Sequence, residues 1–279
     1  MAVMVVCGLL VGAGVAAGCR WGGLQFQPPP AASAETRTDV ARRYVWSVAV
    51  ATASGLGAGV LVAGAGGRVV MRLLAVSSPD TVQGRVTEAE QIVGEITVGG
   101  TVGFVVFTAL FFGLATGFLY LLVHRWLPAG RLGGLAFGAL LLVVAGTRIE
   151  PLRTDNPDFD IVGPSWVSLL SFGVLVLLHG VVVAALAARY ASTLPLLARE
   201  RPALVGHAPL LLLVPAVFPL LIVALVGLVV VALSQVGQIR AGLHGRNATL
   251  VGRVILAGAV LVAVPGFVTA VSDIAGRGP

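Results

Sequence analysis

The sequence contains no lysine, only two cysteines and few charged residues of either sign. All 18 basic residues are arginine, and charged residues make up 11% of the 279 positions, less than half of the roughly 25% found in soluble domains. So few charges cannot cover the surface of a water-soluble protein. Cys7 and Cys19 are too few for a secreted disulfide scaffold, and a P-loop is excluded because its lysine is missing.

What the chain has instead is apolar residues, which make up 57% of it and give a mean hydropathy of +1.00. This content excludes intrinsic disorder and predicts an all-α, polytopic transmembrane helical bundle. The net charge of +6 does not indicate a nucleic-acid partner, because the arginines stand singly or in pairs between apolar runs and form no basic stripe. The expected partner is the lipid bilayer.

Seven stretches approach the roughly 20 apolar residues that a helix needs to cross a bilayer. They cover about 2–18, 44–66, 98–122, 132–147, 165–188, 209–233 and 252–271. Residues 1–43 are expected to form the first span and a flexible link rich in proline and alanine, and residues 44–279 the bundle. If the first span is absent or cleaved, six spans remain.

The orientation is predicted from the arginines in the links, because cytoplasmic links are enriched in positive charge. The arginines divide almost evenly between the two sides of a seven-span chain. The tight turn from Arg125 to Arg131 is placed in the cytoplasm. We therefore expect a cell-membrane protein with its N-terminus outside and its C-terminus in the cytoplasm.

The second predicted span carries a row of small residues, four apart, on one helix face: Ala51, Gly55, Gly59, Ala63 and Gly67. Two later spans carry glycine pairs of the same spacing: Gly99/Gly103, Gly113/Gly117 and Gly134/Gly138. Membrane helices associate through close approach at small residues, since lipid is as apolar as leucine. The row predicts tight packing against another glycine-bearing span, and the other interpretation is a substrate path lined by backbone.

Prolines interrupt the last two predicted spans. Pro215 and Pro219 lie one turn apart in the sixth span, and Pro265 lies in the seventh. Proline kinks a helix and frees backbone carbonyls. These residues predict kinked helices, with either a structural or a gating role.

His179 is an ionisable residue near the middle of the fifth predicted span. Such a residue at membrane depth is a candidate functional site. One interpretation is a neutral imidazole bonded to a neighbouring hydroxyl or carbonyl, and the other is a proton-relay or ligand group. The remaining histidines lie near span ends without the spacing of a metal site, so no metal is assigned.

The link between the second and third spans is rich in charge. Arg68 and Arg72 lie one turn apart on a continuation of the second span, and Glu88 and Glu95 share a face of the following element. Either arginine is expected to pair with either glutamate at the membrane surface. The interpretations are solvated or salt-bridged helix ends, or a charged vestibule for an anionic or zwitterionic ligand such as a lipid headgroup.

Two helix starts are predicted within this link. Ser78 before Pro79 is typical of an N-cap followed by proline at the first helical position. Thr87 and Glu90 form the pattern of a capping box. The third span is therefore expected to begin as an amphipathic helix near residue 87.

The link between the fourth and fifth spans holds four carboxylates in eleven residues: Glu150, Asp155, Asp158 and Asp160. Carboxylate oxygens suit a divalent ion. However, the helical Asn-Asp-x-x-Asp spacing of magnesium-dependent diphosphate enzymes is absent, and Pro157 favours a turn. A solvated acidic turn is the favoured interpretation, a cation site is the alternative, and no cofactor is assigned.

Several short motifs resemble one group of proteins. They include Ser78-Pro79, Thr87-Glu88, Gly94-x-Ile96-Thr97 and the later Asp155-Asn-Pro-Asp-Phe159. In these motifs the chain resembles uncharacterised multi-pass membrane proteins of high-GC bacteria over about residues 40–190. The group has no assigned activity, so the resemblance implies a bacterial membrane protein and carries no catalytic residues.

No strong catalytic motif is found, neither a Gly-x-Ser-x-Gly elbow nor His-Glu-x-x-His. We therefore predict a non-catalytic accessory or scaffold protein, or a small transport-type protein. Its partner would be another membrane protein, or a second copy, bound through glycine-rich helix faces. The alternative is a membrane-embedded enzyme that acts on a lipid or lipid-linked substrate through the acidic link at 150–160.

Overall fold

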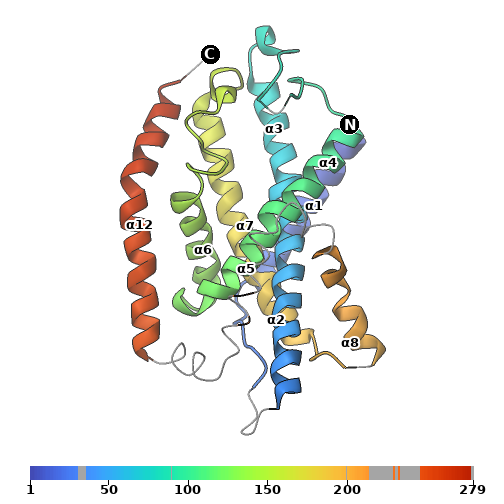
Figure 1. The fold of residues 1–279 in the computed structure, drawn as a ribbon. Coiled ribbons are helices and arrows are strands. Elements are labelled where there is room, and N and C mark those ends of the chain that lie inside the picture. Colours follow the sequence, from blue (N-terminus) through green and yellow to red (C-terminus); the bar gives the residue numbers. More distant parts are fainter. Residues whose placement is uncertain are drawn as a thin grey trace.

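The computed structural model describes residues 1–30, 36–88, 90–198, 200–213 and 246–277, together with 229 and 232. Within these residues the chain is helical, and its one β-contact is an isolated antiparallel bridge between Val86 and Ile92. Long helices run side by side along the molecule (Figure 1). The expected helical bundle is therefore confirmed in class.

Five helical segments are long and apolar enough to cross a membrane: Ala2–Trp21, Arg37–Ser77, Val98–Trp126, Ser165–Thr193 and Asn247–Ala275. The first segment is α1 (Ala2–Trp21), and the second joins α2 (Arg37–Ala58), η1 (Gly59–Gly64) and α3 (Ala65–Ser77). The third joins α4 (Val98–Thr108), η3 (Ala109–Gly113), α5 (Leu114–Val123) and η4 (His124–Trp126). The last two are α7 (Ser165–Thr193) and α12 (Arg246–Ala275).

The predicted count of seven spans is not confirmed. The fourth expected span is α6 (Arg131–Val144), whose 14 residues extend only about 21 Å at 1.5 Å per residue, short of a hydrocarbon core of about 30 Å. Of the sixth expected span, 209–233, the structure describes residues 209–213, 229 and 232, and the first of these lie in η6 (Ala208–Leu212), which follows α8 (Arg201–Gly206). Pro215 and Pro219 lie outside the described residues. Pro265 lies inside the continuous helix α12.

The two long mixed helices change winding where they cross. η1 and η3 are both π-helical turns set within α-helix, and they contain Gly59 and Gly113 of the small-residue rows. A β-carbon placed on Gly59 would lie 2.7 Å from the Cα of Ala109 and 3.0 Å from the Cα of Gly113. The predicted packing of the second span against another glycine-bearing span is thus confirmed, since only hydrogen on Gly59 permits this backbone approach.

A second seam joins α6 to α7. A β-carbon on Gly138 would lie 2.8 Å from the Cα of Leu177, and one on Gly134 would lie 2.8 Å from the Cα of Val181. The pair Gly99 and Gly103 has no such neighbour within 4 Å. Equal spacing in the sequence therefore corresponds to an interior seam in some helices and to an open face in another.

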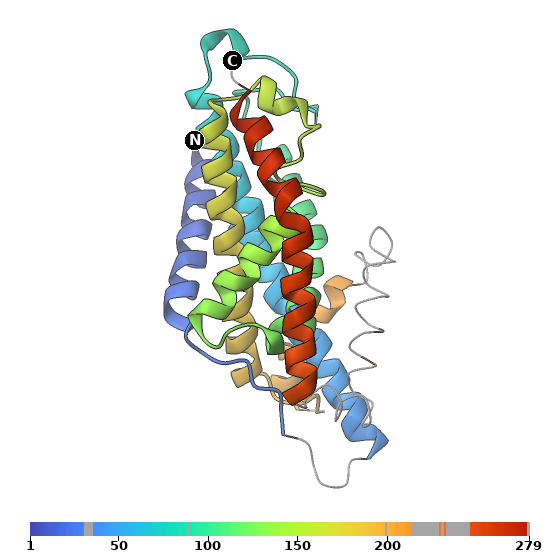
Figure 2. The ribbon, with the colours of Figure 1, turned by 90° about the vertical axis from the view of Figure 1, so that its left-hand side faces the viewer.

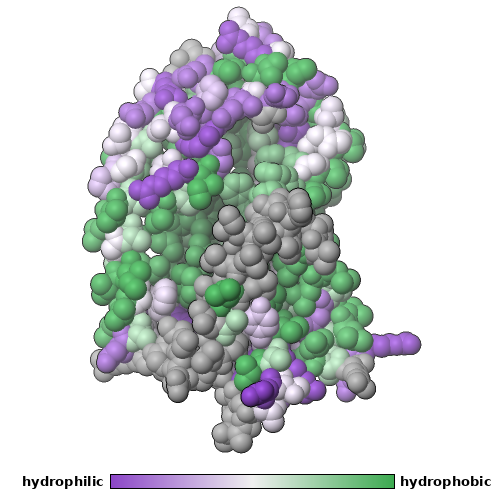
Figure 3. All heavy atoms as spheres, in the orientation of Figure 1, coloured by the Kyte–Doolittle hydropathy of each residue, from purple (hydrophilic) through white to green (hydrophobic). Residues whose placement is uncertain are grey.

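Both described ends of the chain lie toward one end of the bundle (Figures 1 and 2). The expected topology, with the N-terminus outside and the C-terminus in the cytoplasm, places the two ends on opposite sides of the membrane, and it stays a prediction. Figure 3 shows hydrophilic side chains concentrated at the same end, above a predominantly hydrophobic middle. An apolar band below polar side chains is the distribution expected of a membrane protein.

Candidate functional site

The polar end near the termini is built by two links, residues 78–97 and 145–164, which we call the cap. Val82 and Val93 of the first link pack with Ala75 of α3, and Ile161 and Val162 of the second link cover them. Ser78 Oγ also accepts a 2.7 Å hydrogen bond from the Gly163 amide and donates to the Leu74 carbonyl. The two links therefore form one unit, although the sequence suggested two separate polar regions.

The prediction that a helix begins near residue 87 is wrong. The Thr87 amide donates to the Gln91 carbonyl, and the Val93 amide donates to the Arg85 carbonyl, so this segment is a small hairpin. Glu90 has a φ of 55°, which a helix does not tolerate. Helix α4 begins only at Val98, with the Thr97 side chain as its N-cap, because the polar residues before it find partners in the other link.

The helix start expected at Ser78 is also wrong. Ser78 is the C-cap of α3 and its hydroxyl faces Leu74 and Gly163. Pro79 precedes only the 3-10 turn η2 (Asp80–Val82), which has no side-chain cap. A hydroxyl that bridges a helix end to a distant link has the same local sequence as an N-cap, so the pattern alone does not separate them.

Arg153 is the centre of the cap's ion pairs. Its Nη2 lies 2.6 Å from both carboxylate oxygens of Glu88. Its Nε lies 3.5 Å from Glu150 Oε1 and 3.4 Å from Asp155 Oδ1. One guanidinium thus neutralises carboxylates from both links. The prediction that Glu88 pairs with Arg68 or Arg72 is wrong, because its partner is Arg153.

The other aspartates of the acidic link each have their own partner. Asp158 Oδ1 accepts a 2.8 Å hydrogen bond from the Glu88 amide, and it lies in η5 (Pro157–Asp160). Asp160 lies 3.8 Å from the Nε of Arg277. Across the described ranges, no group of three histidine, cysteine or carboxylate side chains is placed to hold a metal ion. The three aspartates therefore do not converge in the way that the cation alternative requires.

Burial changes the acidity of two cap carboxyls. Burial raises the pKa of Glu150, which Arg153 opposes and which Glu88, Asp155 and Asp158 reinforce. Burial also raises the pKa of Asp158, against the lowering effect of the hydrogen bond from the Glu88 amide. The hydrogen bond to Glu88 raises the pKa of Arg153. Arg153 therefore stays charged, while Glu150 and Asp158 keep their protons up to a higher pH than ordinary carboxyl groups do.

The cap is expected to be more stable at pH 5 than at pH 7.5. A carboxyl with a raised pKa binds its proton more tightly in the folded cap, so its contribution is full below the ordinary pKa and is lost as pH rises through the raised one. Hydrogen exchange of the Gly84, Thr87 and Val93 amides, corrected for intrinsic rates, measures this. Glu150→Gln should weaken the pH dependence, and protection that grows from pH 5 to 7.5 contradicts the prediction.

Arg68, Arg72 and Glu95 do not form a joint site. Arg68 is buried in α3, with its Nη1 3.7 Å from Met71 Sδ and its guanidinium carbon 5.9 Å from the centre of the Phe104 ring. Arg72 Nη1 lies 3.5 Å from the Gly94 carbonyl oxygen. Glu95 is exposed and has no ion pair within the described part of the chain. These contacts do not bring Arg68, Arg72 and Glu95 together in the way that the vestibule interpretation requires.

His179 lies inside the bundle, where it is 5% exposed. Its Nε2 is 2.8 Å from Thr116 Oγ1 of α5, and that hydroxyl also lies 2.7 Å from the Phe112 carbonyl. The hydroxyl has one proton, so when it donates to Phe112 the imidazole Nε2 donates to it. This is the hydroxyl-bonded arrangement of the first interpretation, and it joins α7 to α5 at depth.

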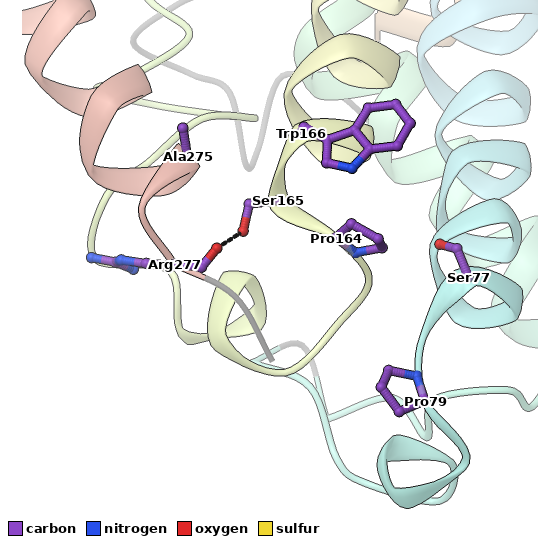
Figure 4. Close-up of a pocket in the computed structure, with 7 residues that line it drawn as sticks. All are labelled: Ser77, Pro79, Pro164, Ser165, Trp166, Ala275 and Arg277. Atoms are coloured by element: carbon purple, nitrogen blue, oxygen red, sulfur yellow. Dashed lines mark hydrogen bonds between the residues drawn. The ribbon is translucent and has the colours of Figure 1, made fainter.

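Two cavities flank the end of α12. One of about 390 Å³ is lined by Ser77, Pro79, Pro164, Ser165, Trp166, Ala275 and Arg277. In Figure 4 the Ser165 hydroxyl meets the Arg277 carbonyl, and the Arg277 guanidinium points away from the Trp166 indole. The second, of about 320 Å³, lies between Arg148 and Asp273 and is otherwise lined by small residues and threonines. His179 lines neither cavity.

The sequence did not predict the contacts that Arg153, Ser78 and Thr116 make. Arg153 stands inside the acidic link itself, which was a usable signal for internal charge pairing. Ser78 and Thr116 carry no local signal, because their partners Gly163 and His179 lie 85 and 63 residues away.

Comparison with models of known protein families, with curated proteins and with solved structures gives no match. The resemblance to membrane proteins of high-GC bacteria therefore stays a prediction.

Proposed function

We propose that the chain is a cell-membrane protein that acts without catalysis, as an accessory or scaffold subunit. Its partner is another membrane protein or a second copy, bound along α1. The observation that carries this proposal is an outward row of small residues on α1, formed by Gly8, Gly12 and Ala16, which are all exposed. A β-carbon on Gly8 or Gly12 would meet nothing within 4 Å.

The opposite face of α1 supports this proposal, since it uses the same kind of residue to pack inside the molecule. A β-carbon on Gly14 would lie 3.0 Å from Val62 Cγ2, and one on Gly18 would lie 3.1 Å from Val181 Cγ1. Small residues let helix backbones approach closely in lipid. The outward row has the same four-residue spacing and so offers a second helix a comparable packing surface.

The arrangement of the other candidate residues favours this role over transport or catalysis. His179 is bonded to Thr116 within the core, whereas a transport role predicts a polar cavity reaching it. The cap aspartates pair with Arg153, Arg277 and the Glu88 amide, whereas a lipid enzyme predicts their convergence on one ion.

Crosslinking in native membranes tests the proposal. Gly12→Cys, combined with Cys19→Ser, is expected to form crosslinks on mild oxidation or with a bifunctional reagent, and the product mass distinguishes a second copy from a different protein. Gly12→Leu, tested by co-purification, should abolish the association, because a leucine holds the helices apart. Gly173→Leu, at another open position, is the matched control. Monomer alone, or association unchanged by Gly12→Leu, contradicts the proposal.

We also propose an orientation with the cap outside the cell. The end of the bundle opposite the cap, here called the arginine-rich end, is formed by the last turns of α1, α5 and α7 and the first turns of α2, α6 and α12 (Figure 1). Its arginines include Arg20, Arg37, Arg42, Arg43, Arg125, Arg131, Arg189 and Arg201, and its described carboxylates are Asp39 and Glu200. Positive charge favours the cytoplasmic side, so both described ends of the chain are placed outside.

Reporter fusions after residue 277 test this orientation. Alkaline phosphatase is expected to be active there and green fluorescent protein to be dark, because the first folds outside the cytoplasm and the second inside. The same reporters fused after Arg189 should give the reverse pattern. A fluorescent fusion after residue 277 restores the cytoplasmic C-terminus and overturns the proposed orientation.

A further inference from the structure

Arg125 has more buried guanidinium nitrogens without an acceptor than any other described arginine of the arginine-rich end. It lies in η4, where the chain leaves α5, and its Nε and Nη1 are buried without an acceptor. Among the described residues the Arg125 side chain makes no hydrogen bond and no ion pair. An arginine at the end of a membrane helix is normally hydrated or paired. The Arg125 guanidinium departs from this rule, because no described residue supplies a counter-charge.

The neighbours of Arg125 offer it no negative group. His124 Nδ1 is 2.8 Å from the Leu121 carbonyl, and its ring lies against Phe26 at 4.5 Å between centres. Trp126 packs against Gly252 of α12, and its buried Nε1 also lacks an acceptor. The η4 turn therefore presents nitrogen donors and aromatic rings without a carboxylate.

The two described carboxylates of this end do not pair with Arg125 either. Asp39 accepts hydrogen bonds from the amide and the hydroxyl of Thr36, within the N-terminal capping box of α2. Glu200 precedes α8 and makes no ion pair within the described ranges. Neither described carboxylate of this end therefore neutralises Arg125.

We propose that Arg125 binds the phosphate of an anionic phospholipid at the arginine-rich end. Its Nη2 is the one guanidinium nitrogen that is not shut inside the protein, so a ligand approaches along that edge. Arginine is suited to phosphate because its planar donors match the phosphate oxygens. Trp126 beside it is the residue type that anchors helices at the membrane surface, and basic sites between helix ends bind anionic headgroups.

The proposal rests on the membrane location alone, and on neither the accessory role nor the orientation. A phosphodiester with net negative charge, such as that of phosphatidylglycerol, is the ligand class. Phosphatidylcholine carries the same phosphate with a compensating ammonium group. Inorganic phosphate has the same oxygens without acyl chains, so the three probes separate the contributions of charge, phosphate and lipid.

Thermal unfolding of the full chain in neutral detergent tests the proposal. Phosphatidylglycerol is expected to raise the Tm more than an equal mole fraction of phosphatidylcholine, and more than inorganic phosphate at the same concentration. Arg125→Gln should weaken phosphatidylglycerol binding about tenfold, the scale of one charge-assisted hydrogen bond. Arg20→Gln, which removes an exposed arginine of the same end, should leave the Tm shift unchanged.

Native mass spectrometry provides a readout that does not depend on stability. The wild type and Arg20→Gln are expected to retain one more phosphatidylglycerol than Arg125→Gln. If Arg125→Gln does not fold, Arg125→Lys, which keeps the charge and loses the planar fork, should retain the lipid more weakly than the wild type. Equal retention by the wild type and the Arg125 variant overturns the proposal, and so does an equal shift from phosphatidylcholine or inorganic phosphate.

Discussion

Replacing Gly59 by leucine is expected to unfold the bundle or to separate α2 from the α4–α5 helix. The β-carbon alone would lie 2.7 Å from the Ala109 Cα and 3.0 Å from the Gly113 Cα. Both obstacles are backbone atoms, which cannot move aside as a flexible side chain does. Overpacking a core typically costs about 1–3 kcal/mol, and a backbone clash in a rigid seam lies at the upper end. Thermal unfolding in detergent measures the loss.

Gly103→Leu is the matched control for this prediction. It makes the same chemical change on α4, at a position where a β-carbon meets nothing within 4 Å. Its Tm is expected to stay near that of the wild type, since the new side chain enters open space. A Gly59→Leu protein with unchanged Tm would show that the seam does not hold the helices together.

Replacing Arg153 by glutamine is expected to open the cap without unfolding the bundle. Among the described residues, the change removes the one cation that lies within 4 Å of Glu88, Glu150 and Asp155, and it leaves their charges without this partner. Glu88 and Glu150 are partly exposed, so water screens part of the effect. We expect the hairpin amides of Thr87 and Val93 to exchange up to about fivefold faster, the scale of an exposed ion pair.

Arg148→Gln separates the role of this pair from a general loss of charge. Arg148 lies in the same link, is exposed and has no ion pair among the described residues. Its removal should leave exchange in the hairpin unchanged. A double-mutant cycle of Arg153→Gln with Glu88→Gln should be non-additive, because both changes delete the same contact. Additive effects would show that the two links are held together by other contacts, such as Ser78 with Gly163.

How far the sequence alone predicts the candidate site is clearest at the cap. The acidic link and the position of Arg68, Arg72 and Glu88 were visible, and the turn at Pro157 was expected. The partner of Glu88 was not predicted, because Arg153 is 65 residues away and local spacing carries no information on such pairs. The capping pattern at Thr87 misled for a related reason, since its side chain stabilises a hairpin once the second link covers it.

The sequence by itself determined that this protein is helical and that its surface is too apolar for a water-soluble protein. Eleven per cent charge cannot cover a soluble surface, and the four-residue row through Gly59 marks one helix face because helical periodicity is local. The tertiary structure alone decided that Gly113 rather than Gly103 meets this face, that Thr116 bonds His179, and that both described ends lie at one end of the bundle. These outcomes depend on which helices pack together, and packing brings together residues whose separation along the chain carries no periodic signal.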